Sequence, residues 1–302
     1  MMKKWLTALS LLLIASTSMA QDKPGNVFQN GTAVQANVRL RVSVNFMGDQ
    51  VKVINPLVKK GVSIVVINQS DVVVFSTAQF DNIEFVLSGV TKDGSFKIYS
   101  DNDFLLTLNG VRLANVDGPA INVQASSTVS VELADGTTSI LGDGVDYVDA
   151  PSDEDQKAAF FSEGELVFSG EGSLVVNGQG DGKHGLASDD YIEVRSGNIV
   201  VASADKDAIR TNDGFWLFGG LVDLNSDGDG VDAGDGPVEI LAGTIDVAIT
   251  DEGKDAIKCD GTILIVGGDV ELNVDGDRAK GLNAVSLNID RRAIDVCQSN
   301  PI

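Results

Sequence analysis

This chain of 302 residues contains few histidine, cysteine, aromatic and basic residues. Its single histidine, His184, argues against a histidine-rich zinc site and against a Ser-His-Asp triad. The only two cysteines, Cys259 and Cys297, allow one disulfide at most if the protein is exported. Lys and Arg total 22 against 44 Asp and Glu, which gives a formal charge of −22. Such a surface repels nucleic acid and attracts cations.

Long apolar runs are also missing, apart from one at the N-terminus. Lys3 and Lys4 precede the apolar stretch 5–14, and Ser18-Met19-Ala20 forms a small-x-small cleavage site before Gln21. This pattern predicts a secretory signal peptide over residues 1–20. The run is shorter than the ~20 residues of a membrane-spanning helix. We therefore expect a protein without membrane insertion, secreted or held in the cell envelope after cleavage at about Ala20.

Similar segments recur along the second half of the chain. Each contains three short β-like runs, separated by polar or glycine turns, without helical periodicity. Two stretches upstream, "GPAINVQASSTVSVELADG" and "AAFFSEGELVFSGEGSLVVN", are degenerate copies. An apolar residue marks each clear copy, with spacings of 23, 22, 26 and 25, at Leu186, Ile209, Val231, Ile257 and Leu282. A glycine returns in step at Gly197, Gly220, Gly243 and Gly268.

A unit of this length cannot bury a core alone, so the copies must stack. Three strands per copy predict an all-β fold, a right-handed parallel β-helix with coils ~4.8 Å apart. The predicted inward columns are Ile192/Phe215/Val238/Ile263, Val194/Leu217/Ile240/Ile265 and Ile199/Val222/Ile245/Val270. A fourth column, Ser188/Thr211/Ala233/Cys259/Ala284, is small throughout. This favours Cys259 as a small core residue over a disulfide to Cys297.

Aspartates gather in the turns between successive copies. Facing carboxylates ~5 Å apart repel by roughly 3 kcal/mol at an effective dielectric of 20, and by less than about 1 kcal/mol in water. A partly shielded column therefore needs cations or protons, and hard oxygen ligands outside the cell favour Ca²⁺. The alternative is that Asp and Gly simply form solvated turns. The predicted calcium ligands are Asp205, Asp207, Asp227, Asp229 and Asp255.

Two groups of outward residues are candidates for contact with a sugar. If Phe215 and Leu217 point inward, Trp216 and Phe218 point outward and could form a stacking platform. The alternative is that another segment or a partner covers this stripe.

The second group is Arg210 and Lys258, which flank Asp232 beside a column of small residues. An extended polymer could lie along this column, although tight packing would require small residues equally well. The column is Gly185, Ala208, Gly230, Ala256 and Gly281.

Several motifs resemble, in order, those of secreted carbohydrate-binding domain-containing proteins. They are "LTLNGVRLANVDGPAINV" from Leu106, "VELADGTTSILGDG" from Val131, "KAAFFSEGELVFSGEGSLVVNGQGDGKHGLASDD" from Lys157 and "DKDAIRTNDG" from Asp205. The resemblance covers roughly residues 84–284. It implies a calcium-binding right-handed parallel β-helix, similar in fold to pectate lyases, that binds cellulose or acidic pectin-type polysaccharide. "RAKGLNA", from Arg278, departs from the family's acidic pattern in the last coils.

The leading hypothesis is an exported, calcium-stabilised polysaccharide-binding protein without catalysis. An acidic polymer would need bridging calcium or a basic strip such as Arg210, Lys258, Arg278 and Lys280, whereas a neutral glucan such as cellulose would need aromatic stacking. The alternatives are a calcium-dependent polysaccharide lyase acting by β-elimination and a structural or adhesive β-helical surface protein. The predicted organisation is signal peptide 1–20, N-terminal β cap or irregular coils 21–80, β-helix 81–290 and C-terminal tail 291–302.

Overall fold

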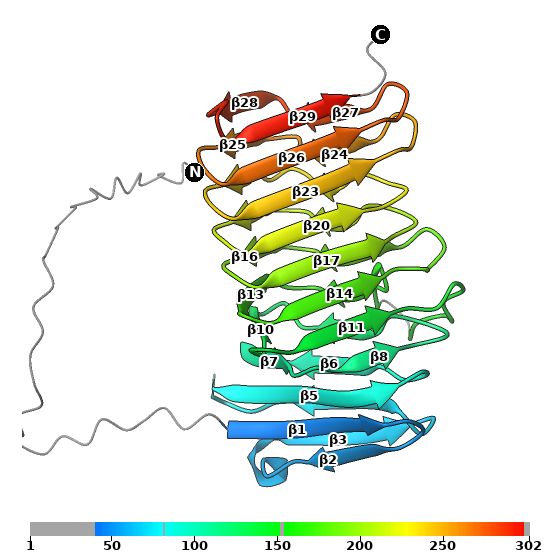
Figure 1. Cartoon of the computed structure of the whole chain (residues 1–302). Helices are drawn as coiled ribbons and strands as arrows, with labels where there is room; N and C mark the ends of the chain where they lie inside the picture. Colours follow the sequence, from blue (N-terminus) through cyan, green and yellow to red (C-terminus); the bar gives the residue numbers. More distant parts are fainter. Residues whose placement is uncertain (1–39, 81, 152–153, 299–302) are drawn as a thin grey trace, which may run out of the picture. The chain divides into compact units, whose positions relative to one another are not determined.

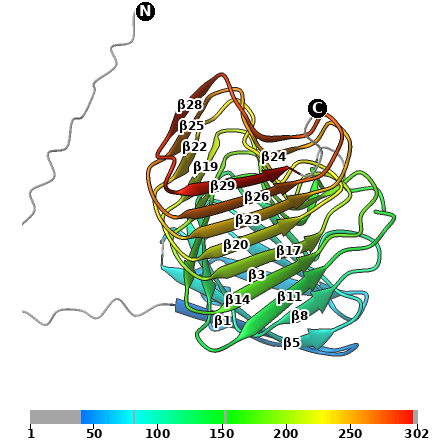
Figure 2. The same cartoon turned by 45° about the horizontal axis from the view of Figure 1, so that its top comes forward.

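The computed structural model describes residues 40–80, 82–151 and 154–298, which belong to one compact unit. The strands of this unit stack as successive coils (Figure 1), and one short 3-10 helix, Val58–Lys60, interrupts them. Strands on three sides enclose the core, as the oblique view in Figure 2 shows. Within these residues no helix is long and apolar enough to cross a membrane.

The first face of the coils is a ten-stranded sheet. It is parallel from β4 onward, since each strand pairs with the equivalent strand of the next coil. The parallel β-helix predicted from the repeat is therefore confirmed. The strands of this face are β3 (Val62–Ile67), β4 (Asp71–Ser76), β6 (Phe96–Ser100), β9 (Ile121–Gln124), β12 (Ala158–Ser162), β15 (His184–Ser188), β18 (Ile209–Thr211), β21 (Val231–Asp232), β24 (Asp255–Lys258) and β27 (Lys280–Asn283).

The second and third faces are continuous with each other because β5 (Ile83–Thr91) pairs with both β7 and β8. The second face consists of β7 (Phe104–Leu108), β10 (Val129–Leu133), β13 (Leu166–Gly170), β16 (Tyr191–Val194), β19 (Gly214–Leu217), β22 (Val238–Ile240), β25 (Thr262–Ile265) and β28 (Ser286–Ile289). The third face consists of β8 (Arg112–Ala114), β11 (Thr138–Gly142), β14 (Ser173–Asn177), β17 (Asn198–Ser203), β20 (Leu221–Asn225), β23 (Thr244–Ile249), β26 (Asp269–Val274) and β29 (Ile294–Gln298).

The first described strands form an irregular β region. β1 (Leu40–Met47) pairs in parallel with β5 but antiparallel with β2 (Val51–Ile54). β3 and β4 form a second antiparallel hairpin, whose turn residues Asn68 and Gln69 have φ angles of 47° and 74°. Ile67 pairs with Asp71, so three residues form this turn, and positive φ angles are typical of tight hairpin turns. The two hairpins make this end of the β-helix different from its parallel coils.

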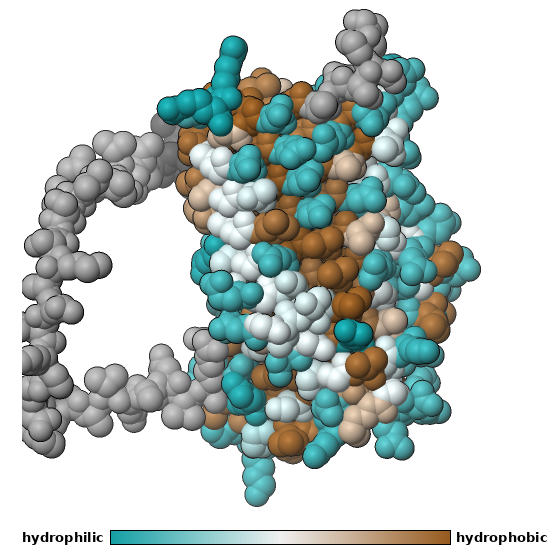
Figure 3. Space-filling model, in the orientation of Figure 1, coloured by the Kyte–Doolittle hydropathy of each residue, from teal (hydrophilic) through white to brown (hydrophobic). Residues whose placement is uncertain are grey.

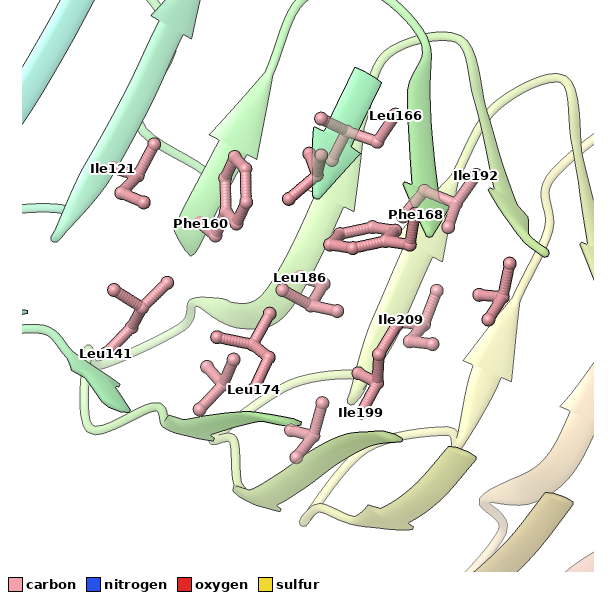
Figure 4. Packing of buried hydrophobic residues seen from close by; sticks show 14 of the residues in the cluster. Ile121, Leu141, Phe160, Leu166, Phe168, Leu174, Leu186, Ile192, Ile199 and Ile209 are labelled. Atoms are coloured by element: carbon pink, nitrogen blue, oxygen red, sulfur yellow. The ribbon is translucent and has the colours of Figure 1, made fainter. Parts of the chain in front are cut away.

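The inward columns have the register predicted from the repeat. Ile192 pairs with Phe215, Phe215 with Val238 and Val238 with Ile263, and all four side chains are fully buried. The equivalent columns that begin at Val194 and Ile199 are also in register and buried. Figure 4 shows side chains from all three faces meeting in the interior. Burial of these columns at about 25 cal/mol per Å² of apolar area is the main stabilising contribution.

The repeated glycines form the turn between the second and third faces. Gly197, Gly220, Gly243 and Gly268 have φ angles of 93°, 82°, 88° and 87°. L-residues rarely adopt this left-handed region. A Cβ atom on Gly220 would also lie 2.3 Å from the carbonyl oxygen of Gly197 in the preceding coil. Glycine is therefore required both by the turn and by the close stacking of coils.

Both small-residue columns face the interior. Cys259 is free and 3% exposed, which confirms its prediction as a small core residue. In the other column, a Cβ atom on Gly185 would lie 2.5 Å from Val201 Cγ1, and one on Gly230 would lie 2.3 Å from Val247 Cγ1. Tight internal packing therefore explains why these positions are small.

A longer connection between β11 and β12 lies over the outward side of the first face. We call its described residues, 143–151 and 154–157, the arm. Glu154 accepts hydrogen bonds from Tyr99 and from Lys97 Nζ, the latter at 2.8 Å. Phe161, on the outward side of β12, is fully buried, and Lys157 Nζ lies 5.3 Å from its ring centroid. The arm separates two hollows on this face.

Candidate functional site

A column of lysines runs along one rim of the first face. The strand register aligns Lys157, Lys183, Lys206, Gly228 and Lys254 in successive coils. Lys157, Lys183 and Lys254 directly precede a first-face strand, whereas Lys206 and Gly228 lie three residues before one, in the turn. We call Lys157, Lys183, Lys206 and Lys254 the lysine column. Neighbouring strands lie ~4.8 Å apart, so the backbone positions of the column are regularly spaced, with one gap at Gly228. Lys157 Nζ is paired with Asp155 at 2.7 Å and with Asp189 at 2.6 Å, so Lys183, Lys206 and Lys254 carry the positive charge of the column.

Beside the lysine column runs a ladder of aspartates. Asp207 Oδ1 accepts a hydrogen bond from the Asp229 backbone N–H at 2.9 Å, and Asp229 Oδ1 accepts one from Asp255 at 2.7 Å. Asp255 Oδ1 continues the series by accepting the Lys280 N–H at 3.1 Å. We call Asp207, Asp229 and Asp255 the aspartate ladder. Each carboxylate satisfies a backbone donor of the next coil, where the turn provides no strand partner.

A third column, on the strands themselves, carries alternating charges. Arg210, Asp232 and Lys258 pair in register. Arg210 Nη1 lies 2.6 Å from Asp232 Oδ2, and Lys258 Nζ lies 3.1 Å from the same oxygen. Lys258 Nζ also lies 3.2 Å from Asp229 Oδ2, so it links this column to the aspartate ladder.

The carboxylates of Asp207, Asp229 and Asp232 form the candidate metal site. One oxygen from each lies within 4.8 Å of the others. These hard oxygen donors fit Ca²⁺, which takes six to eight oxygen ligands. Three aspartates cannot fill that shell alone, so water or the carboxylates of a ligand would have to complete it. Lys258 now pairs with Asp229 and Asp232, and Arg210 pairs with Asp232, so both cations would have to move away from these carboxylates.

Burial and neighbouring charges shift the pKa values at this site in different directions. Burial raises the pKa of Asp229, and the charge of Asp207 raises it further. Burial also acts to raise the pKa of Asp207, but the hydrogen bond and charge of His184, the Asp229 N–H and the charge of Arg210 together outweigh it, so this pKa is lowered. Desolvation acts to lower the pKa of Lys258, yet its bonds to Asp232 and Asp229 raise it overall. Lys258 is therefore held firmly as an ammonium ion.

These three columns line a groove of about 550 Å³. Its charged walls comprise six Lys and Arg side chains against three Asp side chains, although the whole chain has a formal charge of −22. Lys157, Arg210 and Lys258 are paired with carboxylates, so the excess positive charge in the groove comes from Lys183, Lys206 and Lys254. Its charged lining residues are Lys157, Lys183, Lys206, Arg210, Lys254, Lys258, Asp207, Asp229 and Asp232.

The structure divides the aspartates that were predicted as calcium ligands. Asp207 and Asp229 line the groove, together with Asp232, which the sequence had placed only between Arg210 and Lys258. Asp205 and Asp227 line a separate hollow, and Asp205 Oδ2 accepts a hydrogen bond from the Gly182 N–H at 2.7 Å. Asp255 belongs to the ladder, and its Oδ2 accepts a 2.6 Å bond from Asn283.

The predicted aromatic platform lies on the second face, away from Arg210 and Lys258 on the first. Trp216 and Phe218 both point outward, since Phe215 and Leu217 are buried. Trp216 contacts Tyr191 edge-on, with ring centroids 5.1 Å apart, and its ring folds back over Gly214. Phe218 is 42% exposed. The four residues proposed for sugar contact therefore do not form one site.

The third face carries a mixed outward column. Val175 and Val200 are followed in register by Asp223, Asp246 and Glu271. Figure 3 shows this face, where teal polar residues adjoin brown apolar ones. Burial raises the pKa of Asp246, and the charges of Glu271 and Asp223 raise it further.

The lysine column is the feature that the repeat alignment missed. Three positions before the apolar markers Leu186, Ile209, Val231 and Ile257 stand Lys183, Lys206, Gly228 and Lys254, respectively. The spacing of the repeat therefore contains the signal for the column.

Comparisons with known proteins agree with this fold. The sequence matches the family of carbohydrate-binding domain-containing proteins over residues 67–299, and the chain therefore belongs to this family. A solved structure titled "polysaccharide lyase-like protein from C. thermocellum, Gadolinium derivative" is similar, with a TM-score of 0.73 and 25% identity. The similarity covers 84% of this chain and 98% of that one. A comparison with curated proteins gave no match.

Proposed function

We propose that this exported protein binds an acidic polysaccharide of the pectin type in the groove of the first face, without cleaving it. The lysine column is the observation that carries the proposal. It places positive charges at coil spacing along a polymer's path, and the rest of the protein would repel such a ligand. Membership in the carbohydrate-binding family supports a polysaccharide as the ligand class.

Calcium has a defined place in this proposal. Asp207, Asp229 and Asp232 would hold the ion, and carboxylates of the sugar would complete its oxygen shell. The ion would then join two acidic partners that otherwise repel. The similar solved structure is titled a gadolinium derivative, and Gd³⁺ is, like Ca²⁺, a hard cation that prefers oxygen ligands.

Charge reversal in the lysine column tests the proposal directly. Lys206→Glu combined with Lys254→Glu should weaken retention of the mature protein on polygalacturonate about tenfold or more, through lost charge-assisted hydrogen bonds and new repulsion. The matched control is the double variant Lys52→Glu/Lys59→Glu, which makes the same two charge reversals at exposed positions outside the groove. Equal retention of both double variants would contradict groove binding. If the wild-type protein fails to bind any acidic or neutral polymer, a structural stalk becomes the better hypothesis.

Chelation tests the calcium part separately. Removal of calcium should release the polymer from the wild-type protein, and Asp232→Asn should bind equally weakly with and without calcium. Retention that persists unchanged in chelator would mean that the lysines bind the polymer without a bridging ion.

A lyase is the second candidate, because Arg210 and Lys258 adjoin the aspartates and the similar structure is titled lyase-like. β-Elimination is most efficient with a general base whose pKa lies near the operating pH. The aspartates raise the pKa of Lys258, and arginine stays protonated. While Lys258 remains paired with the aspartates, both side chains are therefore suited to binding anions rather than to taking up a proton. Ultraviolet absorption from unsaturated uronide during incubation with polygalacturonate would overturn the non-catalytic assignment.

A further inference from the structure

The second hollow on the first face lies on the other side of the arm and is distinct from the groove. Its volume is about 250 Å³. The hairpin turn of β3 and β4, the outward side of β6, the loop after β8 and the arm form its walls. Its lining residues include Ile67, Asp71, Val73, Asp117, Val148 and Gln156.

Specific contacts hold the walls of this hollow in place. The Val148 N–H donates to the Asp117 carbonyl at 2.8 Å, which ties the arm to the loop after β8. Asn115 Nδ2 donates to the Pro119 carbonyl at 2.9 Å within that loop. The Lys97–Glu154 ion pair anchors the arm to β6, and the two side chains are only 20% and 14% exposed. The hollow is therefore preformed, as binding pockets for small ligands usually are.

The lining combines apolar surfaces with hydrogen-bonding edges. Ile67, Val73 and Val148 supply apolar contact, while Asp71, Asp117 and Gln156 supply acceptors and an amide donor. This composition matches a pyranose ring, which has apolar C–H faces and hydroxyl edges. Sugar hydroxyls can donate to the carboxylates and accept from the amide.

Local charge decides which sugars fit. Lys97 is already paired with Glu154, so its charge is neutralised, whereas Asp71 and Asp117 keep the hollow acidic. Burial raises the pKa of Asp117, and the negative charges of Asp71 and Asp93 raise it further. A uronate would be repelled here, in contrast to the cationic groove.

We propose that this hollow is a second carbohydrate site and that it takes an uncharged pyranose unit. The protein then has two sites on one face, one for an acidic polymer and one for a neutral sugar. The inference does not need the groove to bind anything, because the two hollows share no lining residue.

Calorimetric titration of the mature protein with cellotetraose, mannotetraose and tetragalacturonate tests the second site. Asp117→Ala combined with Gln156→Ala should weaken binding of the neutral tetrasaccharide about tenfold, through the loss of two or more hydrogen bonds. Asp146→Ala, an exposed arm position outside the lining, is the matched control and should bind as the wild type does. Asp117→Gln or Asp117→Asn, which retains an acceptor, should recover part of the affinity.

The groove variant Lys206→Glu/Lys254→Glu separates the two proposals. It should lose tetragalacturonate binding but keep the neutral tetrasaccharide. Absence of binding by both neutral probes would overturn the second site and leave the groove untouched. Neutral binding that survives the Asp117/Gln156 change but disappears in Trp216→Ala would also overturn it, by placing that sugar on the second face. Tighter binding of chitosan tetramer than of either neutral probe would overturn the assignment to an uncharged sugar.

Discussion

Replacement of Asp229 separates the two roles of the aspartate ladder, which are hydrogen bonding between coils and charge. Asp229 is 6% exposed, and its Oδ1 accepts the Asp255 N–H at 2.7 Å. Asp229→Ala leaves that donor without its acceptor, which costs about 1–3 kcal/mol. Loss of one contact to the partly exposed Lys258 adds at most about 1 kcal/mol. At about 2–4 °C per kcal/mol for a domain of this size, a loss of about 2 kcal/mol lowers Tm by about 4–8 °C.

Asp229→Asn retains an acceptor for the Asp255 N–H and removes only the charge. Relief of the repulsion from Asp207 and loss of the attraction to Lys258 act in opposite directions. We therefore expect a Tm change of less than about 2 °C in chelator. Calcium at 100 times its Kd should add about 2.7 kcal/mol to the wild type, and both variants should lose most of that gain.

Thermal unfolding in calcium and in chelator measures both effects. Asp235→Ala is the matched control, because Asp235 is exposed, lies in the same coil and is none of the predicted calcium ligands. Equal melting temperatures for Asp229→Ala and Asp229→Asn in chelator would refute the hydrogen-bond role. An undiminished calcium gain in both variants would refute the metal site at Asp207, Asp229 and Asp232.

Two further predictions concern the turns. Gly220→Ala should lower the free energy of unfolding by about 2 kcal/mol or more, since it combines an unfavourable φ with a Cβ atom 2.3 Å from Gly197 O. Gly136→Ala, where φ is also positive but nothing lies within 4 Å, should lose only the backbone part, as urea midpoints would show. Because the folded pKa of Asp207 is lowered, its carboxylate stabilises the protein above the unfolded pKa of about 3.9, and this contribution is lost as pH falls through the folded value. The Tm advantage of the wild type over Asp207→Asn should accordingly be larger at about pH 6 than at about pH 3, and a pH-independent difference would contradict it.

The repeat made the coils predictable residue by residue. Once Leu186, Ile209, Val231, Ile257 and Leu282 are aligned, the side-chain alternation of a strand determines which neighbours face the core. The pairing of Ile192 with Phe215 and the glycine turn at Gly220 follow from the same alignment. Each residue stacks on the equivalent residue of the neighbouring coil, so the alignment of the repeats also predicts the long-range contacts.

The candidate sites were less predictable because they depend on side chains that reach across columns. Asp232 lies on a strand, yet its carboxylate joins those of Asp207 and Asp229 from the turn. The arm has no counterpart in the other copies, so nothing in the alignment indicated that it would lie on the first face. The second hollow exists only because of the arm, and its residues come from four separate segments.

The stacking of coils in the β-helix fixes the spacing between the lysines of the lysine column. The backbones of successive lysines lie one coil repeat apart, about 4.8 Å, except those of Lys206 and Lys254, which are separated by two coils. If the charges of a polymer repeat at a different interval, the mismatch between these charges and the lysines grows with the length of the polymer. Each added unit then contributes less than the one before, so affinity rises with oligomer length and levels off once the mismatch exceeds the reach of a lysine. If the groove binds an acidic polymer as proposed, the fold itself would select for the interval at which the charges of that polymer repeat.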